Sequence, residues 1–226
     1  MVIMVLYCLL ISCISMVITI YIAVRFYRNL YTDEGYLMHT LPVTPRQLIL
    51  AKLLVAVLWV FALSLLALWA ICCILLSSIP AIALIDMPEA IHTLMEYFPQ
   101  IFGMGPVAFL VFYVALSLVS AFSSVLTAYA AVSLGQLFSK YKVMASVLCY
   151  IGFTMLIQTV TTVLMIPSLT KLILSQDMVE TASAVPAYFG AYMREVFFIS
   201  MVGSAICAVI SYILTEYVMR RQLNLD

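Results

Sequence analysis

The sequence contains long stretches without any Asp, Glu, Lys, Arg or His. Five of these stretches have at least 20 residues: 1–24, 53–85, 97–139, 143–170 and 196–215. About 20 apolar residues cross the hydrocarbon core of a bilayer as a helix, and charged side chains are costly there. Only 9% of the residues are charged, whereas soluble domains contain about 25%. The stretches therefore predict a polytopic membrane protein.

The stretch 97–139 is too long for one span, and it contains the turn-forming sequence Gly103-Met104-Gly105-Pro106. Its helix is therefore expected to begin near Pro106 and to end near Phe138. The predicted fold class is all-α, a bundle of membrane helices forming one transmembrane domain over residues 1–226. The five spans are expected at about 1–24, 46–78, 106–138, 143–166 and 194–218.

The basic residues gather on one predicted side of the membrane. Lys and Arg are enriched in cytoplasmic connections. Two basic residues, Lys171 and Arg194, fall on one side, and eight fall on the other: Arg25, Arg28, Arg46, Lys52, Lys140, Lys142, Arg220 and Arg221. We therefore expect the first and third connections and the C-terminus to face the cytoplasm. Five spans then place Met1 outside, together with the connections 79–105 and 167–193.

The first connection, residues 25–45, is unusually polar for this chain. Residues 44–47, Thr-Pro-Arg-Gln, have the form of a capping box with proline at the first helical position, which predicts the start of the second span. Upstream, Thr32 can cap a short helix that has two acids in its first turn and stops at Pro42. This short helix either meets a cytoplasmic partner or rests at the lipid headgroups, and composition alone favours neither.

The outer connections also have partly apolar patterns. An amphipathic helix on the outer surface is predicted by apolar residues at i, i+3, i+4 and i+7: Ile91, Leu94, Met95 and Phe98. The connection 167–193 mixes apolar and polar residues, with expected breaks at Pro167 and Pro186. It either dips back into the membrane or covers the outer end of the bundle, and the sequence leaves both open.

The chemistry that an enzyme would need is missing from the sequence. None of the seven glycines belongs to a GxxxxGK[ST] phosphate-binding loop, so we do not expect this chain to hydrolyse nucleotide or to be an enzyme. His39 and His92 fall on opposite predicted sides and cannot share a metal ion. Ten acids balance ten bases, which gives no indication of a nucleic-acid partner.

The deepest polar groups in the predicted spans are amides and hydroxyls, of which Gln158 is the most prominent. Hydrogen bonding between helices is the favoured interpretation of Gln158, and lining a transport path is the alternative. Carriers driven by ions or protons usually place ionisable residues at this depth. If this chain moves a substrate uphill, the energy is therefore expected to come from a partner.

Two cytoplasmic segments have a recognisable pattern. Residues 25–52 read RFYRNLYTDEGYLMHTLPVTPRQLILAK, and residues 131–142 read AVSLGQLFSKYK. The first resembles the DEGYL…TLPVS…Q…KL signature in the first cytoplasmic loop of bacterial ABC-2 type permease subunits, which have the type V exporter fold. The second resembles the GQLF-K-K turn between the fourth and fifth helices of that family. The resemblance covers roughly residues 20–226, although the outer connections match only in layout.

The resemblance implies a six-helix fold with both termini inside. The five spans would be family helices two to six, and a first helix with its cytoplasmic amphipathic segment would be missing, which accounts for an outward Met1. In that family the loop between helices two and three docks on a separate ATPase subunit. Carried over, the coupling element would consist of Asp33, Glu34, Gly35, Tyr36, Leu37, Thr40, Leu41 and Pro42.

The function implied by the resemblance is that of a permease subunit in an ABC exporter of the bacterial cell membrane. It would pair with a second permease subunit and with ATPase subunits that bind ATP and Mg²⁺, and this chain would bind no cofactor itself. Its substrate would be apolar or amphipathic. The alternatives are a non-transporting scaffold or sensor subunit that uses the same loop for another partner, and an uncoupled channel or lipid-handling enzyme.

Overall fold

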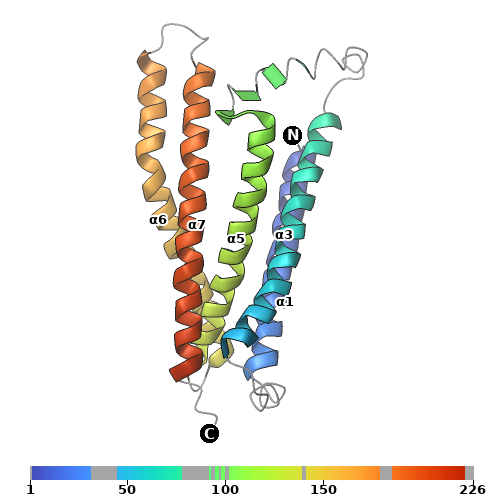
Figure 1. Ribbon diagram of the computed structural model, residues 1–226, viewed down its shortest axis with the longest axis vertical. Helices are drawn as coiled ribbons and strands as arrows, with labels where there is room; N and C mark the ends of the chain where they lie inside the picture. Colours follow the sequence, from blue (N-terminus) through green and yellow to red (C-terminus); the bar gives the residue numbers. More distant parts are fainter. Residues whose placement is uncertain are drawn as a thin grey trace. The chain divides into compact units, whose positions relative to one another are not determined.

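The computed structural model describes five long helices and part of one connection. The described residues are 2–31, 45–77, 92, 95–96, 98–99, 102–138, 141–178 and 185–221. Regular structure in these ranges is entirely helical, and the long helices are α1 (Val2–Tyr31), α3 (Pro45–Ser77), α5 (Pro106–Gly135), α6 (Lys142–Met178) and α7 (Val185–Arg221) (Figure 1). Within the described ranges, five helices are long and apolar enough to cross a membrane. The predictions of an all-helical chain and of five spans are confirmed.

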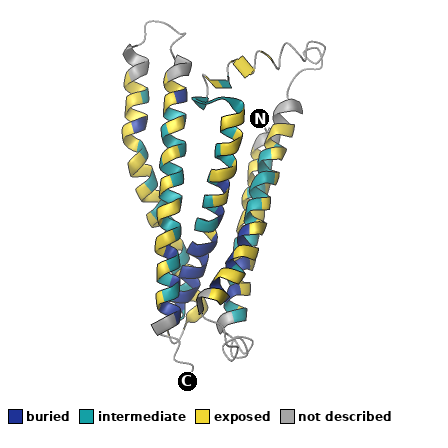
Figure 2. Cartoon of the chain, in the orientation of Figure 1, coloured by how far each residue is buried: buried dark blue, intermediate teal, exposed yellow. Residues whose placement is uncertain are grey.

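Large apolar side chains are exposed along every one of these helices (Figure 2). Examples from successive helices are Leu6, Trp59, Val107, Leu148 and Ile210. Soluble monomers rarely expose contiguous apolar surface of this extent, whereas lipid-facing helix surfaces are expected to be apolar. The chain is therefore a multi-pass membrane protein.

Three helices, α1, α6 and α7, extend further than the sequence predicts. α1 continues past Val24 to Tyr31 and so includes Arg25 and Arg28. Long basic side chains near a helix end can reach water while the backbone stays helical, so charge alone does not end the helix. α7 begins at Val185 rather than near 194. Its Pro186 lies in the first turn, where proline disrupts no hydrogen bond of the helix.

The predicted break at Pro167 is wrong, because α6 continues through this proline to Met178. Proline removes one backbone donor from the helix interior, but membrane helices tolerate it because hydroxyl side chains and local adjustments satisfy the freed groups. Here the Thr170 hydroxyl donates to the Pro167 carbonyl at 2.9 Å. In the described residues, the expected outer connection 167–193 is thus mostly the ends of α6 and α7.

The chain divides into two compact units, and four helices contribute to both. Unit 1 comprises residues 1–67, 118–157 and 204–226. Unit 2 comprises residues 68–117 and 158–203.

The core of unit 1 forms where α1, α3 and the end of α7 pack on the second half of α5. Buried in this cluster are Ile22, Phe26, Ile49, Leu53, Ala56, Val57, Ala121, Val125, Leu126, Tyr129, Val132 and Met219. The part of α5 in unit 1 also buries small residues, including Ala128, Ala131 and Ser133. Figure 2 shows the buried part of this helix in dark blue. Small side chains let membrane helices approach closely, where dispersion contacts hold them together.

The turn between α5 and α6 is closed by tight backbone contact. Gly135 is the last residue of α5, and a Cβ atom there would lie 2.6 Å from both the backbone nitrogen and the Cα of Ser146. The Ser146 hydroxyl donates to the carbonyl of Val132 at 3.5 Å and to that of Lys142 at 2.9 Å. The start of α6 therefore sits against the end of α5 at a position that only glycine leaves open.

In unit 2 the expected turn before α5 packs against α7. Gly103 has a positive φ of 69°, and α5 begins at Pro106, as the sequence predicts. A Cβ on Gly103 would collide with the Gly190 carbonyl oxygen and would lie 3.0 Å from its carbon. Phe102 and Phe109, on either side of the turn, have ring centroids 4.8 Å apart, and Phe109 reaches Phe197 of α7 at 5.8 Å.

We expect Gly103→Ala to destabilise the protein. The left-handed backbone costs a residue with a side chain about 1–2 kcal/mol, and the collision with Gly190 adds to this cost. The melting temperature in detergent should fall clearly. Gly105→Ala is the matched control, because a Cβ at Gly105 meets nothing within 4 Å. Equal melting temperatures for the two variants would contradict this account of the turn.

Candidate functional site

The predicted coupling element lies outside the described residues. This applies to all eight of its members: Asp33, Glu34, Gly35, Tyr36, Leu37, Thr40, Leu41 and Pro42. The structure does describe the two helices that carry the element, α1 up to Tyr31 and α3 from Pro45. The predicted start of the second span at the Thr44-Pro45 step is confirmed by the start of α3. The helices α1 and α3, which flank the coupling element, are called its two supports below.

The two flanking helices, α1 and α3, each pack on α5 through one face. On α1 the buried residues Ile22 and Phe26 are four apart, which puts them on one face. On α3 the buried residues Ile49, Leu53 and Ala56 are spaced four and three apart, which also puts them on one face. These faces belong to the last third of α1 and the first third of α3. The ends of α1 and α3 that flank the polar connection are therefore next to the buried cluster of unit 1.

An aromatic pair lies at the centre of this region. The rings of Phe26 and Tyr129 stack with centroids 3.8 Å apart and an interplanar angle of 12°, and both residues are only 2% exposed. The guanidinium of Arg25, the residue before Phe26, interacts electrostatically with the phenol of Tyr129. Aromatic pairs stabilise by about 0.5–1.5 kcal/mol beyond the burial of their area. The end of α1 is therefore tied to α5 by a specific contact.

Both segments that resemble exporter permeases belong to unit 1. The described parts of the first segment are residues 25–31 and 45–52, and those of the second are 131–138 and 141–142. In the second segment the Gln136 amide donates to the Val132 carbonyl at 3.4 Å, and the Leu137 and Phe138 backbone amides donate three residues back, to Leu134 and Gly135. The described part of this turn, residues 136–138, is thus internally hydrogen-bonded.

Gln158 belongs to unit 2 and is exposed on α6. Its backbone carbonyl accepts a hydrogen bond from the Thr162 hydroxyl at 2.8 Å. Neither the path-lining role nor the interhelical hydrogen bond that the sequence suggested for its side chain is tested by this arrangement. Both stay predictions.

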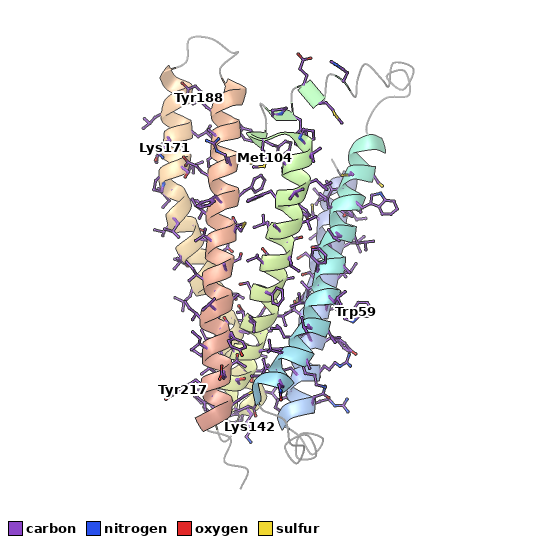
Figure 3. All side chains as sticks on the ribbon, viewed as in Figure 1. Trp59, Met104, Lys142, Lys171, Tyr188 and Tyr217 are labelled. Carbon is purple, nitrogen blue, oxygen red and sulfur yellow. The ribbon has the colours of Figure 1, made fainter. Side chains whose placement is uncertain are left out.

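Unit 2 contains a polar link that the sequence did not indicate. The Lys171 Nζ of α6 lies 3.6 Å from the Glu195 Oε1 of α7, and the buried Ser168 hydroxyl donates to the same carboxylate. Lys171 and Tyr188 are labelled near the corresponding ends of these helices in Figure 3. Lys171 is largely exposed, so the ion pair itself contributes little stability. The link joins two helices and shows no catalytic arrangement.

Comparison of the chain with protein-family models, with characterised proteins and with solved structures found no match in any of the three. The membrane fold is established by the five apolar helices themselves. The resemblance of residues 25–52 and 131–142 to exporter permeases stays a prediction, and no family membership is shown for the chain.

Proposed function

We propose that this chain is the membrane-embedded permease subunit of an ATP-driven exporter of the ABC-2 type in a bacterial cell membrane. A separate ATPase subunit would bind ATP and Mg²⁺ and would dock on residues 33–42. A second permease subunit, identical or different, would complete the path. The proposal is supported by the DEGYL…TLPV sequence together with the way its two flanking helices are packed.

The packing of these supports is the observation that carries the proposal. An element that transmits force must be joined to rigid parts at both of its ends, since a flexible joint would absorb the displacement. Phe26 on one side and Ile49 and Leu53 on the other are all in the buried cluster with α5. Only residues 32–44 separate α1 from α3. A push on this connection would therefore move α1, α3 and the adjoining part of α5 together.

The chemistry of the spans supports an external source of energy. Several hydroxyls within the described spans donate to carbonyls of their own helices: Ser117 to Val114 at 3.0 Å, Thr127 to Ser123 at 2.7 Å and Thr154 to Tyr150 at 3.0 Å. Such hydroxyls satisfy the backbone of their own helix and leave ion coupling to other groups. Ionisable residues of the chain lie toward the helix ends and in the connections. Energy from a partner ATPase fits this distribution.

The exposed apolar faces fit an apolar or amphipathic substrate. A polar solute would need a path lined with hydrogen-bonding groups, because polar groups are costly to desolvate. Many exposed positions of α6, such as Met155, Leu156 and Val160, are apolar instead. The proposed substrate class is therefore a molecule that can leave the lipid phase, such as a hydrophobic peptide or a lipid-linked compound.

Photo-crosslinking from the connection tests the proposal. A photoreactive amino acid at Leu37 in the tagged chain, expressed in its own host, is expected to capture one protein that contains a GxxxxGK[ST] loop. The matched control is the same amino acid at Val147, an exposed apolar position of α6, which should not capture it. Capture at Leu37 of a kinase or another protein without that loop would overturn the proposal in favour of the scaffold or sensor alternative.

A further inference from the structure

A groove of about 560 Å³ lies between α1 and α3 in unit 1, with Tyr129 of α5 at its base. This volume is within the range of about 300–1,000 Å³ that is typical of ligand pockets. The floor of the groove includes the buried residues Phe26 and Ala56, and its wall includes the exposed residues Tyr21 and Trp59. Figure 3 shows Trp59 projecting from α3. The groove is therefore mainly apolar and is open on the side of these exposed aromatic residues.

Tyr129 brings a hydroxyl group to the base of this groove. The residue is only 2% exposed, and its ring is held in place by stacking on Phe26 at 3.8 Å. None of the described residues accepts a hydrogen bond from the Tyr129 hydroxyl. A buried donor without an acceptor is costly, because it has lost its hydrogen bonds to water. An acceptor that enters the groove would remove this cost.

The level of Tyr129 in the membrane indicates which acceptor is available. Arg25 lines the same groove, and its guanidinium interacts electrostatically with the Tyr129 phenol. A charged side chain is costly at the centre of the bilayer, so Arg25 lies toward the membrane surface. Tyr129 is also only about 9 Å along the helix axis from Gly135, the last residue of α5. The hydroxyl therefore lies between the headgroups and the middle of the bilayer, where phospholipids have the ester groups of their acyl chains.

An ester-linked phospholipid fits this groove better than an apolar peptide. Its ester carbonyl accepts hydrogen bonds, and the acyl chain that follows the carbonyl is as apolar as the floor of the groove. A peptide within the bilayer has to use its carbonyls for its own backbone hydrogen bonds, so those acceptors are already engaged. The buried hydroxyl therefore favours a lipid as the occupant.

We propose that the α1–α3 groove binds an ester-linked phospholipid, with the Tyr129 hydroxyl donating a hydrogen bond to an ester carbonyl. One acyl chain lies along the groove toward Ile18 and Trp59, which line the end furthest from residues 32–44. The site requires no particular charge on the headgroup. It does not depend on the proposed export function, because it uses only α1, α3 and Tyr129.

Fluorescence quenching by brominated lipids tests this hydrogen bond. The chain has two tryptophans, and Trp59 lines the groove whereas Trp69 does not. The variant Trp69→Phe leaves Trp59 as the reporter of the groove, and Trp59→Phe leaves Trp69 as a matched reporter on the same helix. Each protein is placed in vesicles of unbrominated ether-linked phosphatidylcholine. Phosphatidylcholine with brominated chains is then added in either its ester-linked or its ether-linked form, and these two forms differ only in the carbonyl groups.

We expect the ester-linked brominated lipid to quench Trp59 with an apparent affinity about two- to ten-fold above that of the ether-linked lipid, which is the contribution of one net hydrogen bond. Trp69 should show no such preference. Tyr129→Phe should abolish the preference at Trp59, because it removes only the hydroxyl and keeps the ring that stacks on Phe26. Tyr212→Phe is the matched control and should retain the preference, because Tyr212 packs against the same buried cluster without lining the groove.

The proposal fails on any of three results. The first is equal quenching of Trp59 by the two brominated lipids in the chain that keeps Tyr129. The second is the same preference at Trp69, which would show a general difference between the two lipids. The third is a preference that Tyr129→Phe retains or that Tyr212→Phe abolishes. Because the comparison of Trp59 with Trp69 leaves Tyr129 intact, it decides the matter even if Tyr129→Phe fails to fold.

Discussion

Glu34→Arg and Gly35→Pro are expected to abolish the ATP-driven activity of the proposed permease–ATPase complex while the chain still inserts into the membrane. Reversing a charge that is paired across an interface costs about 2–5 kcal/mol or more, which corresponds to a loss of at least about 30-fold in binding. Proline at position 35 removes a backbone donor and fixes φ inside the short helix that the sequence predicts there. Both changes lie outside the five membrane helices.

The measurement is the amount of ATPase that co-purifies with each variant and the ATP hydrolysis of the purified complex. Glu96→Arg is the matched control, because it reverses an exposed acid in the predicted outer connection. This control should retain both the ATPase and its activity. Full association and full activity of the Glu34 and Gly35 variants would contradict the coupling role of the connection.

Gly135→Ala is expected to cause a large loss of folded protein. The added Cβ would overlap the backbone of Ser146 at 2.6 Å, and a backbone cannot rotate away as a flexible side chain can. Overpacking of a rigid site typically costs about 1–3 kcal/mol. The expected result is a lower yield of monodisperse protein in detergent and a melting temperature several degrees below that of the unaltered chain.

Gly152→Ala serves as the comparison for this prediction. Gly152 also lies within a helix, but a Cβ there meets nothing within 4 Å. Because alanine is the better helix former, this change should be neutral or slightly stabilising. If Gly135→Ala matched Gly152→Ala in yield and melting temperature, the close approach of α5 and α6 at this turn would be wrong.

The number and rough positions of the helices could be predicted because charge is excluded from the bilayer core. Five stretches without charge became five helices, and the turn signals at Pro45 and Pro106 marked two helix starts correctly. The end of α6 was predicted wrongly at Pro167. The rule that an internal proline ends a helix comes from soluble proteins, where water can bind the backbone groups that proline leaves without a hydrogen bond. In lipid, an unsatisfied backbone is costlier, so the helix continues.

The contacts between the helices could not be predicted from the sequence. In a membrane protein both the lipid-facing and the protein-facing sides of a helix are apolar, so periodicity does not show which side is buried. Phe26 is buried and Tyr21 is exposed, although both are aromatic residues of α1. The contact between Gly135 and Ser146 could not be predicted either. A glycine at a helix end predicts a cap, but it does not indicate which residue packs against it.

The location of residue 34 tests the central claim most directly, namely that the polar connection between α1 and α3 faces the cytoplasm and meets a partner there. Glu34→Cys is placed in a chain whose six native cysteines are replaced by alanine, and intact cells are treated with a membrane-impermeant maleimide. His92→Cys, in the predicted outer connection, is the reference. We predict labelling of position 92 in intact cells, and of position 34 only after permeabilisation. Labelling of position 34 in intact cells would contradict the account.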